Sequence, residues 1–467
     1  MAALLLLSSA CGSPDAPIAR EGLLELGGYD FEHDSILGLN GEWEFYWNRL
    51  YTHADFADPA LAEQLAAERT LIQVPQVWNA AKRKALERDP TAASKQEVDS
   101  TGYATLRLRL RKDGGLGFPE GLRLATRQWG LAFRLYCGGD LILANGVVGR
   151  DVETSRPGRL PVHAALTPAC YESGELIWQI SNFHTALGGP RLPVQMGTRL
   201  RMNAHLFQKD LLAFVLAGVT LIIAVYHLVL WNFQRHSRNH WRFGVLAIII
   251  LLWTGTNNDL VQRFLGEDAH YVEVLKFLLI ALFLMPAAYY AYLQSCYERE
   301  FPAKILPTLV IVGLLFVFHN LLRPTMEITK VLPVYLGLIG LVVFYSVIAA
   351  SFAALRGRPG AIMTVVSCLG VALGVANDAL VYLSVYQNID LVQYGFFFFI
   401  ISQSAVQAGI FTAAYQSADK TSRTLQIEVG KKMHELREAN EKLRELDASR
   451  TAFFQNISHE FRTPLTL

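Results

Sequence analysis

Seven long apolar segments follow one another in the middle of the chain, and they constrain its fold more than any other feature. They comprise residues 211–231, 243–262, 272–293, 305–322, 331–353, 361–386 and 391–414. Each holds about 18 residues or more, the length that an α-helix rising about 1.5 Å per residue needs to cross roughly 30 Å of hydrocarbon. One such helix would fit the core of a water-soluble protein. Seven in succession predict a seven-helix transmembrane bundle, with domain bounds 206–416.

The joints between these segments predict the orientation of the bundle, because Lys and Arg in short loops favour the cytoplasmic side. The joints after the first, third and fifth segments contain Arg235, Arg238, Arg242, Arg299, Lys304, Arg356 and Arg358. The joints after the second, fourth and sixth segments contain Arg263, Arg323 and Lys330. We therefore expect a multi-pass protein of the bacterial inner membrane, in contact with membrane lipid. Its N-terminal domain would be extracytoplasmic and its C-terminus cytoplasmic.

Charge and motif content exclude several classes of function. The chain has 42 Lys and Arg against 41 Asp and Glu, so we expect no nucleic-acid partner. The 52% apolar content is explained by the membrane segments. No spacing of Cys and His is typical of a metal site, and no phosphate-binding loop or dinucleotide fingerprint occurs. We therefore expect no metal in this chain.

The first 19 residues are predicted to be a targeting segment. Residues 1–10 are apolar and end in small residues, as in a signal peptide. Residues 7–11 also resemble the lipidation motif of bacterial lipoproteins, which would make Cys11 a lipid-bearing N-terminus. No basic residue precedes the apolar run, and Ser8 stands where such motifs usually have Leu. Cleavage and lipidation both remain open.

Residues 20–205 are predicted to form an outer β-sandwich or jelly roll. Leucines and arginines alternate over residues 105–111, and apolar residues alternate over 131–135 and 175–180, which is typical of half-buried strands. Gly138-Gly139 and Asn145-Gly146 favour tight turns. One helical stretch is expected near 59–69. Several short strands with turn signals indicate an all-β sensor domain.

Four short sequence motifs in this region resemble those of a known family. The resemblance is carried by Leu-Asn-Gly-Glu-Trp-Glu-Phe-Tyr-Trp at 39–47, Val-Pro-Gln-Val-Trp at 74–78, Gly-Tyr-Ala-Thr-Leu-Arg-Leu at 102–108 and Ser-Asn-Phe-His at 181–184. Together with the bundle, residues 36–414 resemble bacterial seven-transmembrane receptors with diverse intracellular signalling modules. The resemblance implies a galactose-binding-like jelly roll and a small extracytoplasmic ligand, such as a carbohydrate.

Two sets of residues are candidates for contact with that ligand. Three aromatic residues would either stack on a sugar ring or pack the core, and we favour the core: Trp43, Trp47 and Trp78. Three polar residues follow the last strand and are expected at an exposed rim: Asn182, His184 and Arg191. Cys137 and Cys170 would form a disulfide only if their Cα atoms lie within bonding range, and the sequence leaves this open.

Carboxylates occur within two of the apolar segments. Asp259 follows Asn257 and Asn258 in the second segment, and Asp378 follows Asn377 in the sixth. Both lie about 24–26 Å from the cytoplasmic end of their helices, which predicts one level in the outer leaflet. At one level they would be able to face each other or a shared cavity. Intramembrane carboxylates often mark function, but they can also form a polar knot between helices. Both interpretations remain open.

The residues after the last apolar segment predict a cytoplasmic coiled coil over 417–450. An inner seam with steps of four and three is formed by Val429, Met433, Leu436, Asn440 and Leu443. Such spacing, with Asn at one inner position, favours a paired register and therefore a homodimer. A solvent-exposed amphipathic helix is the alternative.

Residues 451–467 are similar to the start of the dimerisation and phosphoacceptor domain of bacterial sensor histidine kinases. Residues 453–465 read Phe-Phe-Gln-Asn-Ile-Ser-His-Glu-Phe-Arg-Thr-Pro-Leu, which matches the phosphoacceptor box throughout. The resemblance implies that His459 accepts the phosphoryl group, that Glu460 acts as acid or base, and that Thr463 serves positioning and phosphatase chemistry. ATP is the expected phosphodonor, through a catalytic domain that this sequence does not contain. A response-regulator receiver domain is the expected partner.

Taken together, the sequence predicts a multidomain membrane protein with a jelly-roll outer domain, a seven-helix transmembrane bundle and a cytoplasmic coiled coil that leads into a histidine-kinase dimerisation helix. Its predicted function is the sensor portion of a transmembrane two-component histidine kinase. The alternatives are a seven-transmembrane ligand-binding receptor without its own kinase activity, with another output such as a cyclase, and a membrane binding protein or transporter.

Overall fold

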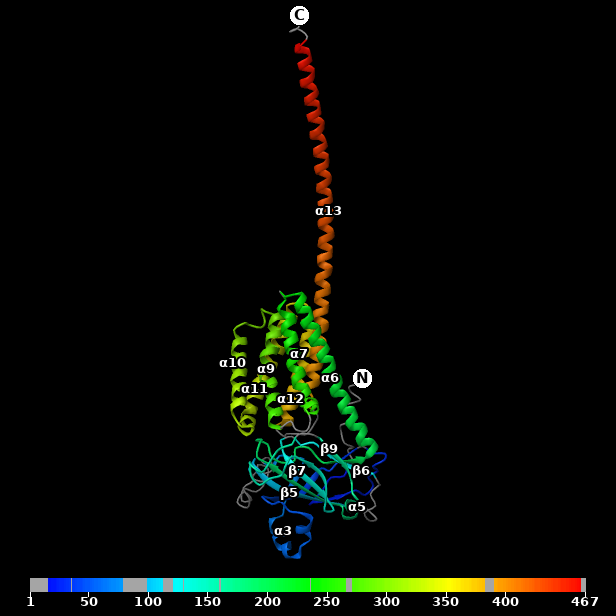
Figure 1. The fold of residues 1–467 in the computed structure, drawn as a ribbon, viewed down its shortest axis with the longest axis vertical. Helices are drawn as coiled ribbons and strands as arrows, with labels where there is room; N and C mark the ends of the chain where they lie inside the picture. The colour runs from blue at the N-terminus through cyan, green and yellow to red at the C-terminus, as the bar shows by residue number, and fades with distance from the viewer. Residues whose placement is uncertain are drawn as a thin grey trace. The chain divides into compact units, whose positions relative to one another are not determined.

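The computed structural model describes residues 16–34, 36–78, 99–111, 121–128, 130–158, 161–235, 237–265, 271–382 and 390–462. For residues 263–265 and 459–462 the description covers the backbone alone. The chain divides into two compact units, Met1–Ser402 and Gln403–Leu467. The first unit contains a sheet domain and a set of long helices, and the second consists of a single helix in its described part (Figure 1). The expected targeting segment lies mostly outside the described residues.

The sheet domain is built from two β-sheets. The larger runs in the order β4 (Thr70–Val74), β3 (Gly41–Trp47), β5 (Gly102–Arg111), β10 (Glu175–Asn182), β7 (Ala132–Cys137) and β8 (Asp140–Asn145), with β1 (Leu23–Glu25) parallel to β5. The smaller runs β2 (Leu37–Gly38), β11 (Gln195–Thr198), β6 (Leu122–Thr126) and β9 (Val162–Ala165). Buried residues of both sheets share one core, so the predicted β-sandwich is confirmed.

Aromatic side chains fill the centre of this core. Trp178 of β10 is fully buried, and its ring centroid lies 5.8 Å from that of Trp43 and 6.1 Å from that of Phe133. Trp43 and Trp78 are also fully buried, and Trp47 is 6% exposed. The core interpretation of these three tryptophans is therefore confirmed, and none of them offers an open face to a sugar.

Short helices connect some of the strands. The helical stretch expected near 59–69 consists of α2 (His53–Ala57), a 3-10 turn (Pro59–Leu61) and α3 (Ala62–Glu68). The guanidinium of Arg49 donates to the Glu68 carboxylate at 2.7 and 2.9 Å, which lowers the pKa of Glu68 to about 2. A further helix, α5 (Pro168–Ser173), carries Cys170, which forms a disulfide with Cys137 of β7. Their Cα atoms are 4.8 Å apart, within the range that this bond requires.

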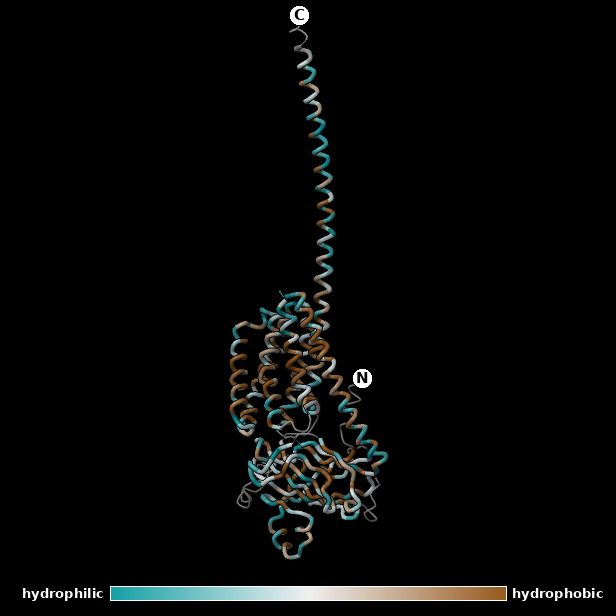
Figure 2. Tube along the Cα trace, viewed as in Figure 1, coloured by the Kyte–Doolittle hydropathy of each residue, from teal (hydrophilic) through white to brown (hydrophobic). Residues whose placement is uncertain are grey.

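The remaining helices of the first unit follow the predicted apolar segments closely. They are α6 (Arg199–Phe233), α7 (Arg238–Asn257), α8 (Leu260–Leu265), α9 (Tyr271–Cys296), α10 (Ile305–Leu322), α11 (Thr325–Leu355), α12 (Ala361–Tyr382) and the start of α13 (Val392–Arg462). In the described part of the chain, six helices are long and apolar enough to cross a membrane: α6, α9, α10, α11, α12 and α13. Hydrophobic residues along these helices appear as brown stretches of the tube in Figure 2.

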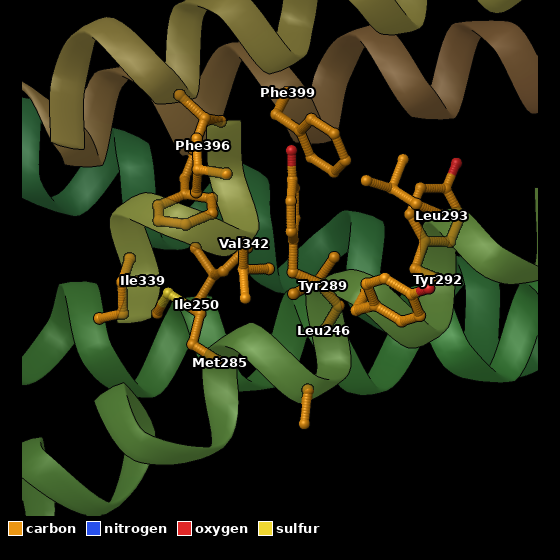
Figure 3. Packing of buried hydrophobic residues seen from close by; sticks show 14 of the residues in the cluster. Leu246, Ile250, Met285, Tyr289, Tyr292, Leu293, Ile339, Val342, Phe396 and Phe399 are labelled. Atoms are coloured by element: carbon orange, nitrogen blue, oxygen red, sulfur yellow. The ribbon is translucent and has the colours of Figure 1, made fainter. Parts of the chain in front are cut away.

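The remaining predicted crossing is the second of the seven apolar segments, which corresponds to α7. This helix has a shorter apolar stretch than the other six. It is apolar from Phe243 to Trp253, but His240 and Arg242 lie near its start and Asn257 at its end. Ten of its 20 residues are buried, and it packs against both α6 and α9. Figure 3 shows Leu246 and Ile250 of α7 among the packed residues Met285, Tyr289, Tyr292, Leu293, Ile339, Val342, Phe396 and Phe399. One face of α7 is thus buried against its neighbours, while Trp241, Val245, Ile248 and Leu252 on its other face are exposed.

One predicted boundary is corrected, at the end of the second apolar segment. The second apolar segment was expected to continue to residue 262, but α7 ends at Asn257 and a short separate helix, α8, begins at Leu260. The last apolar segment and the predicted coiled-coil region together form one continuous helix, α13. Every residue from 408 to 456 is exposed, including Val429, Met433, Leu436 and Leu443 of the proposed seam. The helix is confirmed, and its pairing in a coiled coil stays a prediction.

Candidate functional site

An ion pair joins the sheet domain to the end of α7. Arg127 directly follows β6, and its guanidinium lies 2.6 Å from the carboxylate of Asp259, with the same nitrogen donating to the carbonyl of Asn257 at 2.8 Å. The side chains of Arg127 and Asp259 are 12% and 2% exposed. Because water has so little access to this ion pair, its strength depends closely on the positions of both Arg127 and Asp259.

Asp259 lies at the break between α7 and α8, in a left-handed backbone conformation with φ of 61°. Asp and Asn adopt this conformation more readily than most other residues. The preceding residue, Asn258, donates its side-chain amide to the carbonyl of Thr254 at 2.9 Å and to the side chain of Gln393 at 2.8 Å. Gln393 lies in the first turn of α13. The break in α7 is therefore bonded to the sheet domain and to the start of α13.

A second carboxylate, Asp390, lies just before α13 in the same region. Burial raises the pKa of Asp390, while the positive charges of Arg127, Arg191 and Lys209 and a hydrogen bond with the Asn257 side chain oppose the rise. We call Arg127, Asn257, Asp259 and Asp390 the junction cluster. Its members come from the sheet domain, from α7 and its end, and from the segment before α13, so movement of any one of them alters the electrostatic surroundings of the others.

The loop after β10 makes further contacts with the bundle. The Thr325 hydroxyl donates to the carbonyl of His184 at 2.9 Å, and the backbone amide of Ala186 donates to the Thr329 hydroxyl at 2.9 Å. The Arg191 guanidinium lies 6.0 Å from the ring centroid of Tyr382 at the end of α12. A Cβ atom at Gly130 would lie 2.7 Å from the hydroxyl of Tyr271, the first residue of α9. The sheet domain thus contacts α7, α9, α11 and α12, each at one end of the helix.

These positions differ from the exposed rim expected for Asn182, His184 and Arg191. Asn182 is 1% exposed, and its amide donates to the carbonyls of Ser100 and Thr185, both at 2.7 Å. An exposed position is therefore wrong for Asn182, which stabilises its own loop. His184 and Arg191 are half-buried beside α11 and α12. Ligand binding by any of the three stays a prediction.

Asp378 has partners different from those of Asp259. Its carboxylate accepts the backbone amide of Leu391 at 2.6 Å and that of Val392 at 3.3 Å, at the start of α13. The side chain of Asn377 donates to the same carboxylate at 2.8 Å. Placement of Asp259 inside the second membrane helix is wrong, because α7 ends before it. A signalling role for either carboxylate stays a prediction.

The residues of the phosphoacceptor box lie at the end of α13. His459 and Glu460 belong to its last turns by backbone, as expected for a dimerisation helix. Thr463 lies outside the described residues, so the chemical roles of all three stay predictions. Within the described ranges, no group of three or more His, Cys, Asp or Glu side chains could hold a metal ion.

No sequence pattern indicates that Arg127 or Asp390 belongs to a site. Arg127 pairs with a residue 132 positions further along the chain, and charged residues beside strands are common. Asn257, Asn258 and Asp259 did carry a signal, because a polar run at the end of an apolar segment is unusual. That signal located the site but identified neither its partners nor the break in the helix.

Comparison with known proteins identifies one domain of the chain. Residues 209–408 match the family described as 7TM diverse intracellular signalling, so the chain contains a domain of this kind. A stretch of 42 residues is 52% identical to the Hybrid signal transduction histidine kinase D of Dictyostelium discoideum. That match covers 9% of this chain and 3% of the relative, so the chain spans only a small part of that protein.

Among solved structures, similarity is found to two sugar-processing enzymes. One is a GH2 β-galacturonidase from Eisenbergiella tayi bound to galacturonate, at 13% identity over 37% of this chain and 26% of that chain, with a TM-score of 0.19. The other is a β-glucuronidase from Bifidobacterium dentium complexed with coumarin-3-O-glucuronide, at 16% identity over 36% and 30% of the two chains, with a TM-score of 0.23. At these scores the similarity carries no conclusion about a ligand.

Proposed function

We propose that this chain is the sensor portion of a transmembrane two-component histidine kinase. It couples an extracytoplasmic ligand, such as a carbohydrate, to phosphorylation of His459. The observation that carries the proposal is the continuity of α13, a 71-residue helix whose last turns contain His459. In its first turn, the side chain of Gln393 accepts a hydrogen bond from Asn258, at the break after α7. The 7TM signalling domain and the short histidine-kinase match support the same function.

In this proposal, the chain supplies the phosphoacceptor. A ring nitrogen of His459 attacks the γ-phosphorus of ATP held by a catalytic domain, the bond to the bridging oxygen breaks, and ADP leaves. Glu460 orients the imidazole and takes its proton. The phosphoryl group then passes to an aspartate of a response-regulator receiver domain. The exposed apolar residues Val429, Met433, Leu436 and Leu443 support pairing of two copies through α13.

The experiment that tests this function measures acid-labile phosphate on the full chain, supplied with ATP and a histidine-kinase catalytic domain in trans. We expect phosphate on the wild-type chain and none on the His459→Gln variant, because the substitution removes the imidazole nitrogen that attacks in this proposal. Glu460→Gln should lower the rate of labelling without abolishing it. Undiminished labelling of His459→Gln would contradict the assignment and favour a seven-transmembrane receptor without its own kinase activity.

We further propose that the sheet domain is extracytoplasmic and that the second unit lies in the cytoplasm of a bacterial cell. A reporter enzyme that is active only outside the inner membrane should work when fused at Asp390. It should be inactive when fused at Arg358 or Lys420, because the basic joints retain those positions inside. Activity at Arg358 would be incompatible with seven crossings in this orientation.

A further inference from the structure

The first turn of α13 is bonded to α12 through a side chain. The first four N–H groups of any helix lack partners within that helix. In α13, the Asp378 carboxylate of α12 accepts the amide of Leu391, just before the helix, and the amide of Val392, its first residue. A negative charge at this position is also favoured by the positive end of the helix dipole. Asp378 therefore serves as a cap supplied by a neighbouring helix.

Close contact between the two backbones reinforces this bond. A Cβ atom at Gly374 of α12 would lie 2.6 Å from Cα of Val392, and a Cβ atom at Gly395 of α13 would lie 2.7 Å from the carbonyl oxygen of Gly370. Cβ atoms essentially never approach other heavy atoms to within 3.0 Å in folded proteins. Glycine at 374 and 395 thus permits α12 and the start of α13 to touch over about one turn on either side of the cap.

The other end of this connection reaches the sheet domain. Tyr382, one turn beyond Asp378 on α12, lies under the guanidinium of Arg191 and donates its hydroxyl to the carbonyl of Thr329 at 3.3 Å. Asn377 is buried and orients the Asp378 carboxylate from the adjacent position. The contacts therefore run from Arg191 to α12, and from α12 through Asp378 to the first turn of α13.

We propose that Asp378 is a positioning residue for the phosphoacceptor: it fastens α13 to α12, so that displacement of α12 is passed to the helix that carries His459. This inference rests on the proposed function. It assigns to Asp378 a mechanical role that is distinct from a polar knot, because a knot stabilises the bundle without setting the output.

Two measurements on the same full-length variants test the proposal. Hydrogen exchange of the detergent-solubilised chain reports the amides of Leu391 and Val392 directly. In Asp378→Leu, exchange in this segment should accelerate about tenfold or more, because hydrogen bonds to a charged acceptor are lost. Asp378→Asn, which keeps the shape and one acceptor oxygen, should show a smaller acceleration. Glu327→Gln, an exposed carboxylate at the start of α11, is the matched control and should leave exchange unchanged.

The second measurement is phosphorylation of His459 in trans, normalised to folded protein. Asp378→Leu should change it about threefold or more, with Asp378→Asn intermediate and Glu327→Gln at the wild-type level. Faster exchange with unchanged phosphorylation would overturn the positioning role and leave a structural knot. Unchanged exchange would overturn the cap itself. Absence of phosphate on the wild-type chain would instead refute the proposed function, while exchange would still report whether the cap exists.

Discussion

Replacing Arg127 with alanine should lower the free energy of unfolding of the first unit by about 3–5 kcal/mol. The substitution removes the cation that faces Asp259, whose side chain is 2% exposed and therefore poorly solvated. It also removes the hydrogen bond to the Asn257 carbonyl. Thermal unfolding of the solubilised full chain measures the loss. Arg127→Lys should be intermediate, because one ammonium cannot reproduce the geometry of the planar guanidinium.

A matched series separates the ion pair from general loss of packing. Asp259→Asn retains the shape of the side chain and its tolerance for the left-handed conformation while removing the charge. The double variant Arg127→Ala with Asp259→Asn should lose less stability than the sum of the two single variants, because it leaves no buried charge without its partner, whereas each single variant does. Arg150→Ala, on an exposed loop of the same domain, should have little effect. Strict additivity of the Arg127 and Asp259 effects would contradict an energetically coupled pair.

Truncation of Trp43 to alanine should cost about 3–5 kcal/mol, because a fully buried indole is lost from the centre of the sandwich. Its ring packs against Trp178, and its N–H donates to the carbonyl of Leu39 at 3.1 Å, so both apolar contact and a hydrogen bond disappear. Pulse proteolysis of the full chain in urea measures this change.

Leu141→Ala is a suitable control for that experiment. Leu141 lies on β8 and is 53% exposed, so its truncation should alter stability by only a few tenths of a kcal/mol. A Trp43→Ala chain as stable as this control would show that the tryptophan is not a core residue. It would also reopen the possibility that its ring contacts a ligand.

The parts of the fold that depend on periodicity were predictable from the sequence. Alternation identified β5 and β10, and the length of apolar runs identified the long helices, because both patterns reflect burial along one continuous element. The end of α7 was not predictable in this way. Apolar and amide residues continue past Asn257, and the turn coincides with the left-handed conformation of Asp259 and its pairing with Arg127, neither of which the sequence pattern indicates.

The candidate site was partly predictable for a related reason. Asp259 and Asp378 stood out because carboxylates are costly within apolar segments. Their partners were not predictable, since Arg127 lies in another domain and the amides of Leu391 and Val392 belong to the backbone. Depth along an ideal helix suggested that the two carboxylates share a cavity, but depth does not specify which way a side chain faces or where a helix stops.

The composition of α7 has a consequence for the biogenesis of the protein. Its apolar stretch, from Phe243 to Trp253, is shorter than the roughly 20 residues that a membrane-spanning helix needs, so α7 would be a poor substrate for insertion into lipid by itself. Half of its residues are buried against other helices, so α7 should become stable in the bilayer only after α6 and α9 have been synthesised and can enclose it. Substitutions on the buried face of α7 should therefore reduce the yield of correctly inserted chains before they alter any signal.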